Sequence, residues 1–286
     1  MKALVCFCVL TLFFIRPIYS DGIPDDPVMA KIDSSLIQLM QIQKKIAYIH
    51  PLLEKFQPIA ILNQDDLYIF DYDTLRSQYI FIKKSPPPYP LSDGIRASFP
   101  LSVYNWKPTC VVSLDIFNSI DQLVLVFHEF VHCHQANTME FKIKDSLAIH
   151  QQAMENGDYM WELNHPFPYS DTLFIKYYDE FLSALSDNNE IKIIESRKFL
   201  QNHLTEIDYE YMTWQEWKEG LARYIENRIK KELGLAENFY GREKPYHRVT
   251  FYYGGELFVK YLFNQDKSTI TNLYALFNYI SDTHLQ

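Results

Sequence analysis

The sequence has few cysteines, no run of basic residues and no apolar stretch long enough to cross a membrane comfortably. Only 4 of its 286 residues are cysteine, and its formal net charge is −9. Binding to nucleic acid needs clustered positive charge, so this balance argues against a nucleic-acid partner. The apolar run from Ala3 to Ile15 is too short for a stable membrane span.

The same run, preceded by Lys2 and followed by Ser20, is typical of a secretory signal peptide. We therefore expect residues 1–20 to be removed near Ser20 and the protein to be secreted or periplasmic. The mature chain would keep two cysteines, Cys110 and Cys133. They can pair in an oxidising compartment, or both can be small buried thiols, and the sequence leaves both possibilities open.

Residues 21–286 are predicted to form a single α+β domain. A hydrophobic content of 48% with 16% aromatic residues is ample for a core. Residues 21–118 are predicted to be an N-terminal helix followed by a β-rich part, and residues 119–286 a mostly helical part. The patterns behind this are an amphipathic helix at 27–50, with Ile32, Leu36, Leu39 and Ile46 on one side, and β-rich runs at 67–70, 79–83 and 109–114.

The most informative motif is His128-Glu129-Phe130-Val131-His132, which matches the pattern HExxH. Residues four apart on a helix are separated by about 40° around its axis, so the two imidazoles point the same way. They are then placed to bind one metal ion, and Glu129 beside them can take a proton from the attacking water. This is the ligand pair and general base of a metallopeptidase.

The residues around the motif favour a buried helix. Ser119 and Gln122 form a capping box that predicts its start. Beyond it, a stripe at helical spacing predicts the buried face, formed by Leu123, Val124, Phe127 and Val131. The alternative is a pair of core histidines that hydrogen bond to backbone, but this leaves Glu129 without an explanation.

A third ligand is expected, because catalytic zinc usually takes three protein ligands and keeps one position for water. The metzincin extension needs Gly at 135 and His at 138, whereas the chain has Gln135 and Thr138. Cys133 and His134 lie about 100° and 200° around the helix from His132 and so point away from a shared metal.

Glu219 is the better candidate. Thr213 and Glu216 form a second capping box, which predicts a helix start and puts Glu219 in the second turn. Gly220 and Ala222 are small, so we expect this helix to pack closely against the HExxH helix. A solvated charged helix would explain the charges of this segment but not its small residues.

The segments HEFVH and EGLARYIE together resemble the gluzincin metallopeptidases, especially their aminopeptidase branch. The resemblance implies a zincin-like fold, Zn²⁺ as cofactor and Glu219 as third ligand. Lys218 stands where that branch has Asn, and Arg223 stands where thermolysin-like relatives have an Asp. Glu226, on the same helix face as Glu219, is expected to support a ligand histidine instead.

The spacer between the two segments, residues 133–218, is longer than is usual in that family. It is predicted to contain helices around 140–162 and 171–203. It is either a helical insertion that builds one wall of the cleft or a domain break that would take Glu219 out of reach. In zincins the strand before the HExxH helix, here 109–114, borders the cleft and can pair with an extended substrate.

The resemblance also suggests a group that stabilises the oxyanion of the intermediate. Tyr252-Tyr253-Gly254-Gly255 resembles the aminopeptidase segment Y-x-x-G, which implies this role for Tyr252. His247 is the alternative, as a histidine serves in thermolysin-like enzymes. The run 153–156, AMEN, resembles the exopeptidase GAMEN box, but it follows HExxH in a helical stretch, so we treat it as coincidence.

The sequence therefore predicts a secreted zinc metallopeptidase that acts on a peptide or protein. His128, His132 and Glu219 are expected to bind Zn²⁺, and Glu129 to act as general base. Two other classes remain open: a non-enzymatic binding protein on a degenerate peptidase fold, and a zinc hydrolase of non-peptide amides. The sequence indicates neither the oligomeric state nor whether cleavage is internal or terminal.

Overall fold

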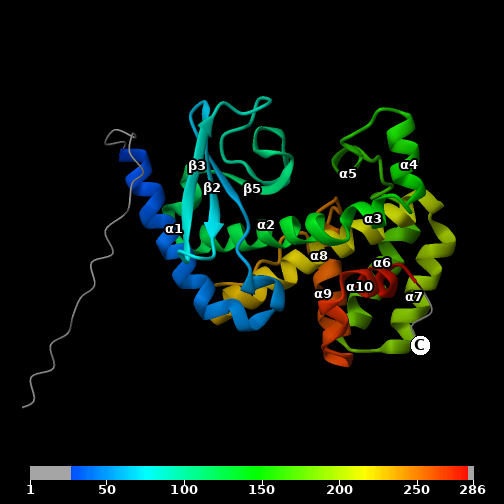
Figure 1. Ribbon diagram of the computed structural model, residues 1–286. Coiled ribbons are helices and arrows are strands. Elements are labelled where there is room, and N and C mark those ends of the chain that lie inside the picture. Colours follow the sequence, from blue (N-terminus) through cyan, green and yellow to red (C-terminus); the bar gives the residue numbers. More distant parts are fainter. Residues whose placement is uncertain (1–26, 283–286) are drawn as a thin grey trace, which may run out of the picture.

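The computed structural model describes residues 27–282 and has the predicted α+β architecture, a five-stranded mixed sheet followed by a mostly helical lobe (Figure 1). The strands are β1 (Ile59–Asn63), β2 (Asp66–Asp73), β3 (Gln78–Ser85), β4 (Arg96–Leu101) and β5 (Lys107–Ser113). The main helices are α1 (Pro27–Ile46), α2 (Ile120–Thr138), α6 (Thr172–Ser186), α7 (Glu190–His203), α8 (Glu206–Glu232), α9 (Thr250–Gln265) and α10 (Leu273–Ser281). The predicted signal peptide lies outside the described residues.

The sheet has the strand order β3-β2-β1-β5-β4, in which only β1 and β5 run parallel. Its side chains alternate between two cores, as the pleat requires. Ile59 and Ile61 of β1 face the main core, whereas Ala60 and Leu62 face a smaller core. Both faces of the inner strands are thus covered, which explains why β1 reads as a continuous apolar run.

The predicted N-terminal elements are confirmed. The helix expected at 27–50 is α1, which ends at Ile46 and is followed by short 3-10 turns at 47–49 and 51–54. Its predicted inward stripe is buried. The three β-rich runs form β2, β3 and β5.

The expectation that the strand at 109–114 can pair with an extended substrate is wrong. This strand is β5, and it pairs with β1 on one side and with β4 on the other. Its backbone groups are therefore already used. The edge strand on that side of the described sheet is β4, which also packs against α2.

Helix α2 crosses the molecule between the sheet and the helical lobe (Figure 1). The sheet lies over one end of α2, and the short helices α3 (Glu140–Lys144), α4 (Ala148–Glu155) and α5 (Trp161–Asn164) gather at the other end. Residues 133–218 are thus mainly a set of helices, as predicted, and they return the chain to α8, which packs against α2. Within residues 27–282, no helix is both long and apolar enough to cross a membrane.

The capping box predicted at Thr213 and Glu216 is wrong. Helix α8 begins at Glu206, where the Thr205 hydroxyl accepts from the Asp208 N–H at 3.1 Å. Thr213 lies inside the helix and donates to the Glu210 carbonyl at 3.0 Å. The 27-residue helix is continuous through this point because its side chains there are buried, and a T-x-x-E pattern has no effect on a helix that already has an earlier cap.

The close contact expected at Gly220 exists but involves another helix. A Cβ on Gly220 would lie 2.5 Å from the Gly255 backbone carbon, and Gly255 belongs to α9. Successive residues of a helix point about 100° apart, so Glu219 faces α2 while Gly220 faces α9. The two glycines allow α8 and α9 to cross at backbone contact, and this fixes the rotation of α8 that presents Glu219.

Candidate metal centre

The local sequence builds α2 as predicted. The Ser119 hydroxyl accepts from the Gln122 N–H at 3.2 Å and caps the helix. The predicted stripe of Leu123, Val124, Phe127 and Val131 is fully buried. His128 and His132 lie on the adjacent face, one turn apart, and are 7% and 6% exposed.

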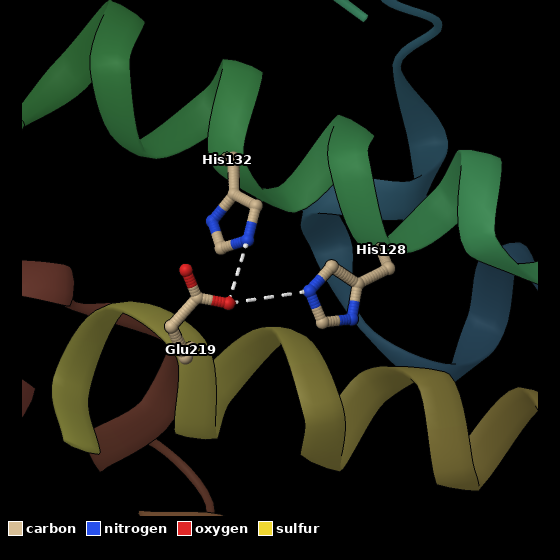
Figure 2. Close-up of side chains that lie close together, drawn as sticks. All are labelled: His128, His132 and Glu219. Carbon is tan, nitrogen blue, oxygen red and sulfur yellow. Dashed lines mark ion pairs between the residues drawn. The ribbon is translucent and has the colours of Figure 1, made fainter. Parts of the chain in front are cut away.

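Three ligand atoms from two helices converge at this face (Figure 2). Glu219 Oε2 of α8 lies 3.5 Å from His128 Nε2 and 3.3 Å from His132 Nε2. The ligand atoms of the three residues lie within 4.8 Å of one another. Glu219 therefore reaches the histidines across the long spacer, and the alternative of a domain break does not hold.

The other nitrogen of each histidine has a partner that sets its orientation. His128 Nδ1 lies 2.9 Å from Glu226 Oε2, and His132 Nδ1 lies 2.9 Å from Gln135 Oε1. A carboxylate oxygen and an amide oxygen are acceptors, so each Nδ1 carries a proton, and each Nε2 faces Glu219 and can bind either a second proton or a metal ion. When both Nε2 atoms are unprotonated, three acceptor atoms face one another, an arrangement that a bound cation stabilises.

The partner of His128 is itself held firmly. Glu226 accepts from Asn238 Nδ2 at 2.9 Å and lies 3.3 Å from Arg223 Nε and 3.7 Å from Lys230 Nζ. Burial raises the pKa of Glu226, but the hydrogen bond and charge of His128 outweigh it, and the pKa falls to about 2. The predicted supporting position of Glu226 is thus present in the structure, and Arg223 pairs with Glu226.

The partner of His132 is neutral and was missed in the sequence. The Gln135 amide also donates to the Lys218 carbonyl at 3.2 Å, so it joins α2 to the turn of α8 that carries Glu219. The sequence excluded the metzincin extension through Gln135, but the contact between Gln135 and His132 was not predicted. Its spacing of three residues from His132, on one helix face, was the available signal.

Electrostatics at the site favour positive charge among the three ligands. Burial lowers the pKa of His128, but hydrogen bonds to Glu219 and Glu226 outweigh it and raise the pKa to about 10. Burial raises the pKa of Glu219, yet His132 and His128 hold it well below its usual value. Two imidazole nitrogens and a carboxylate form a donor set that suits a divalent metal ion, including zinc.

Glu129 lies beside the candidate ligands and is 7% exposed. Burial raises the pKa of Glu129, and the charges of His132 and His128 act in the opposite direction. A buried carboxylate with a raised pKa, next to a metal-binding group, is well suited to accept a proton and then release it.

The structure places Tyr252 near the site, in the first turn of α9. Its hydroxyl accepts from Arg248 Nη1, so the hydroxyl proton remains available to a second partner. Burial and the nearby Glu219 raise the pKa of Tyr252, which keeps this proton in place at neutral pH. Arg248 was not singled out in the sequence, because a lone arginine has no recognisable pattern.

The His247 side chain forms a hydrogen bond in the turn that leads into α9. Its Nδ1 accepts from the Val249 N–H at 3.3 Å, and its ring lies 5.6 Å from the ring of Tyr240. These contacts fix the turn before α9. Of the two candidates for stabilising the oxyanion, His247 contacts this turn and Tyr240, whereas Tyr252 faces Glu219.

A buried ion cluster ties the inserted helices to α8. Lys218 Nζ lies 3.1 Å from Glu140 Oε1 and 2.8 Å from Glu162 Oε2. Lys144 Nζ lies 2.7 Å and 2.6 Å from the same two carboxylates. Because Lys218 directly precedes Glu219, the cluster anchors the backbone of the third candidate ligand.

The remaining sequence predictions in this region concern the two cysteines, the AMEN run and His134. Cys110 and Cys133 are both free and buried, and Cys133 Sγ lies 3.0 Å from Ser98 Oγ of β4. The AMEN run at 153–156 lies at the end of α4, in helical structure, as expected for a coincidental match. His134 is outside the candidate metal group.

No family model, curated protein or solved structure matches this chain. The geometry of the site is therefore the basis for assigning a function to the protein.

Proposed function

We propose that this protein is a zinc-dependent metallopeptidase, in which His128, His132 and Glu219 bind the metal. The observation that carries the proposal is the convergence of two Nε2 atoms and one carboxylate oxygen. The gluzincin resemblance supports the same ligand set, since the motifs HExxH and EGLARYIE lie on the two helices that supply it.

Zinc bound there would act as a Lewis acid that polarises the scissile carbonyl and lowers the pKa of the attacking water toward about 7. Glu129 takes the proton from this water at its carboxylate and delivers it to the leaving amine nitrogen. The Tyr252 hydroxyl, oriented by Arg248, donates its proton toward the oxyanion in a hydrogen bond. An extended peptide would pair with the edge strand β4.

The proposal includes export from the cytoplasm, because Lys2, the apolar run and Ser20 form a signal-peptide pattern. N-terminal sequencing of protein recovered from the periplasm or medium tests this. A mature N-terminus near Asp21 supports it, and an intact Met1 on protein retained in the cytoplasm contradicts it.

The first test is elemental analysis of the purified protein with Glu129→Gln alongside. We expect about one zinc per chain in both, because Glu129 is not a ligand. Turnover of a peptide mixture should fall by about 10²–10⁴-fold in Glu129→Gln, the usual contribution of general acid–base catalysis. Glu155→Gln, at the exposed end of α4, is the matched control and should retain full turnover.

The outcomes separate the three classes. Zinc with peptide cleavage that depends on Glu129 supports the peptidase. Zinc with cleavage of non-peptide amides only points to an amide hydrolase. A protein that binds no metal after refolding with zinc, or binds it without hydrolysing any amide, belongs to the non-enzymatic class.

A further inference from the structure

We propose that Arg248 binds the free C-terminal carboxylate of the substrate, so that the site acts on peptides near their C-terminus. The inference rests on the peptidase function proposed above and defines its substrate class. It comes from a comparison of two arginines that flank one tyrosine of the site.

Arg223 and Arg248 both approach the ring of Tyr252. The guanidinium carbon of Arg223 lies 5.6 Å from the ring centroid, and that of Arg248 lies 5.3 Å away. The Tyr252 hydroxyl faces Glu219, so each guanidinium contacts a residue that itself neighbours a candidate metal ligand.

Arg223 already has a carboxylate partner within the protein. It is 5% exposed, lies 3.3 Å from the Glu226 carboxylate and donates to the carbonyls of Asn238 and Tyr240, both at 3.2 Å. Glu226 neutralises its charge and its Nη1 is bound to two carbonyls, so its role is to support the outer partner of His128.

Arg248 has hydrogen-bond donors that the described part of the chain does not use. It is only half-buried, and its one side-chain hydrogen bond to the described part of the chain runs from Nη1 to the Tyr252 hydroxyl. No carboxylate within residues 27–282 lies at ion-pair distance from it. A guanidinium has five N–H donors in a planar fork, and the fork matches a carboxylate in two parallel hydrogen bonds.

A half-buried cation without a carboxylate partner is costly, and a ligand carboxylate would relieve that cost. The charge of Glu219 acts on Arg248, but the Glu219 oxygen is directed at the two histidines. Arg248 therefore remains available to a carboxylate supplied by the substrate.

The position of Arg248 also separates this role from stabilisation of the oxyanion. The Tyr252 hydroxyl stands between Arg248 and the Glu219 side of the site, so Tyr252 reaches the reacting carbonyl first. An extended chain advances by about 3.3–3.6 Å per residue. The C-terminal carboxylate of a substrate would lie one or two residues beyond the scissile bond. Arg248, which contacts the far side of Tyr252 from Glu219, is placed to bind a carboxylate at that distance.

The test uses three mixtures of hexapeptides with the same sequences, digested by the zinc-loaded full chain and read by mass spectrometry. One is N-acetylated with a free carboxyl terminus, one is N-acetylated and C-terminally amidated, and one has a free amine and an amidated C-terminus. We expect loss of one or two C-terminal residues from the first mixture, at a rate about 10–100-fold above the second, the worth of a hydrogen-bonded charge.

Arg248→Ala should remove this preference for free acids, and Arg248→Lys should restore only part of it, because an ammonium lacks the planar fork. Arg242→Ala, an exposed arginine in the same loop, is the matched control and should keep the preference. Zinc content is measured in every variant, so that loss of metal is not mistaken for loss of the carboxylate contact.

Equal cleavage of acids and amides, or cleavage of the third mixture alone, would overturn the role of Arg248 while leaving the peptidase function intact. An equal fall for acids and amides in Arg248→Ala would overturn it in favour of the oxyanion. If no mixture is cleaved, the peptidase proposal fails. The carboxylate contact is then judged by retention of the acid and amide mixtures on immobilised zinc-loaded protein: preferential retention of acids, lost in Arg248→Ala, supports it, and equal retention overturns it.

Discussion

Two carboxylates on α8, three residues apart, show how the same side chain serves different purposes on one helix. Glu216 is fully buried, lies 2.6 Å from the Arg197 guanidinium and accepts from the Tyr178 hydroxyl at 2.9 Å. Glu219 instead faces the Nε2 atoms of His128 and His132. Glu216 has a permanent cation supplied by the protein, whereas Glu219 meets two imidazoles, whose positive charge is a proton that a bound metal ion would replace.

The largest expected difference is in metal affinity. Glu219→Ala removes one of three ligands and should weaken zinc binding by more than the roughly 10–100-fold that loss of an outer partner costs. The metal-free protein should fold normally, because the imidazoles that Glu219→Ala leaves behind can lose their protons, unlike the buried guanidinium that Glu216 neutralises. Zinc competition with a chromophoric chelator measures the affinity. Full zinc affinity in Glu219→Ala would contradict the assignment of Glu219 as a metal ligand.

Glu216→Ala should show the reverse pattern. It leaves the buried Arg197 charge without its carboxylate, which typically costs about 3–5 kcal/mol. Urea denaturation of the metal-free protein measures this loss. Glu216→Leu with Arg197→Met in the same chain should recover much of it, because an apolar pair needs no counter-charge. A loss below about 1 kcal/mol in Glu216→Ala would contradict the structural role.

The outer partners of the two histidines extend the comparison. Glu226 is a charged acceptor for His128, and Gln135 is a neutral acceptor for His132. Glu226→Gln keeps an acceptor oxygen but removes the charge, and Gln135→Ala removes the acceptor. We expect each to weaken zinc binding by about 10–100-fold. The same chelator competition measures both, and unchanged affinity in both would mean that the Nδ1 contacts do not orient the ligands.

Glu256 on α9 provides a third case, a buried carboxyl with no cation of its own. One of its oxygens has no hydrogen-bond partner, and burial raises its pKa to about 7. The folded pKa is above the unfolded value of 4.5, so the neutral form favours folding below pH 4.5 and this stability is lost as the pH rises through 7.

Glu256→Gln should therefore stabilise the protein at pH 8 and have little effect at pH 4. A shift of one pKa unit corresponds to about 1.4 kcal/mol, and relaxation around the charge reduces the full amount, so we expect about 1–2 kcal/mol. Thermal unfolding at the two pH values measures it. Equal stability of the variant and the parent chain at pH 8 would show that Glu256 is not strained by burial.

Much of the site could be predicted from local pattern. The HExxH spacing places His128 and His132 on one face of any helix, and the stripe that includes Leu123 and Phe127 fixes which face is buried. Glu219 was predicted from the resemblance to the gluzincin segment, and Glu226 because a seven-residue spacing keeps it on the same face as Glu219. Apart from Glu219, these inferences use helix geometry alone, and the structure brings all four side chains to the same site.

Errors arose where a pattern had more than one physical cause. The T-x-x-E at Thr213 matches a capping box, but the helix already had a cap at Thr205. A small residue such as Gly220 indicates close packing without indicating against which helix. Gln135 and Arg248 were missed because their importance depends on partners that no local pattern reveals.

The sequence by itself determined the helix that carries the two histidines, the stripe that buries it and the α+β order of the chain, because these follow from periodicities of 3.6 and 2 residues. Only the tertiary structure decided which face of α8 meets α2, which acceptor holds each Nδ1 and which arginine is left without a carboxylate. These depend on contacts such as that between His128 and Glu226, 98 residues apart, and packing of the whole chain brings such side chains together.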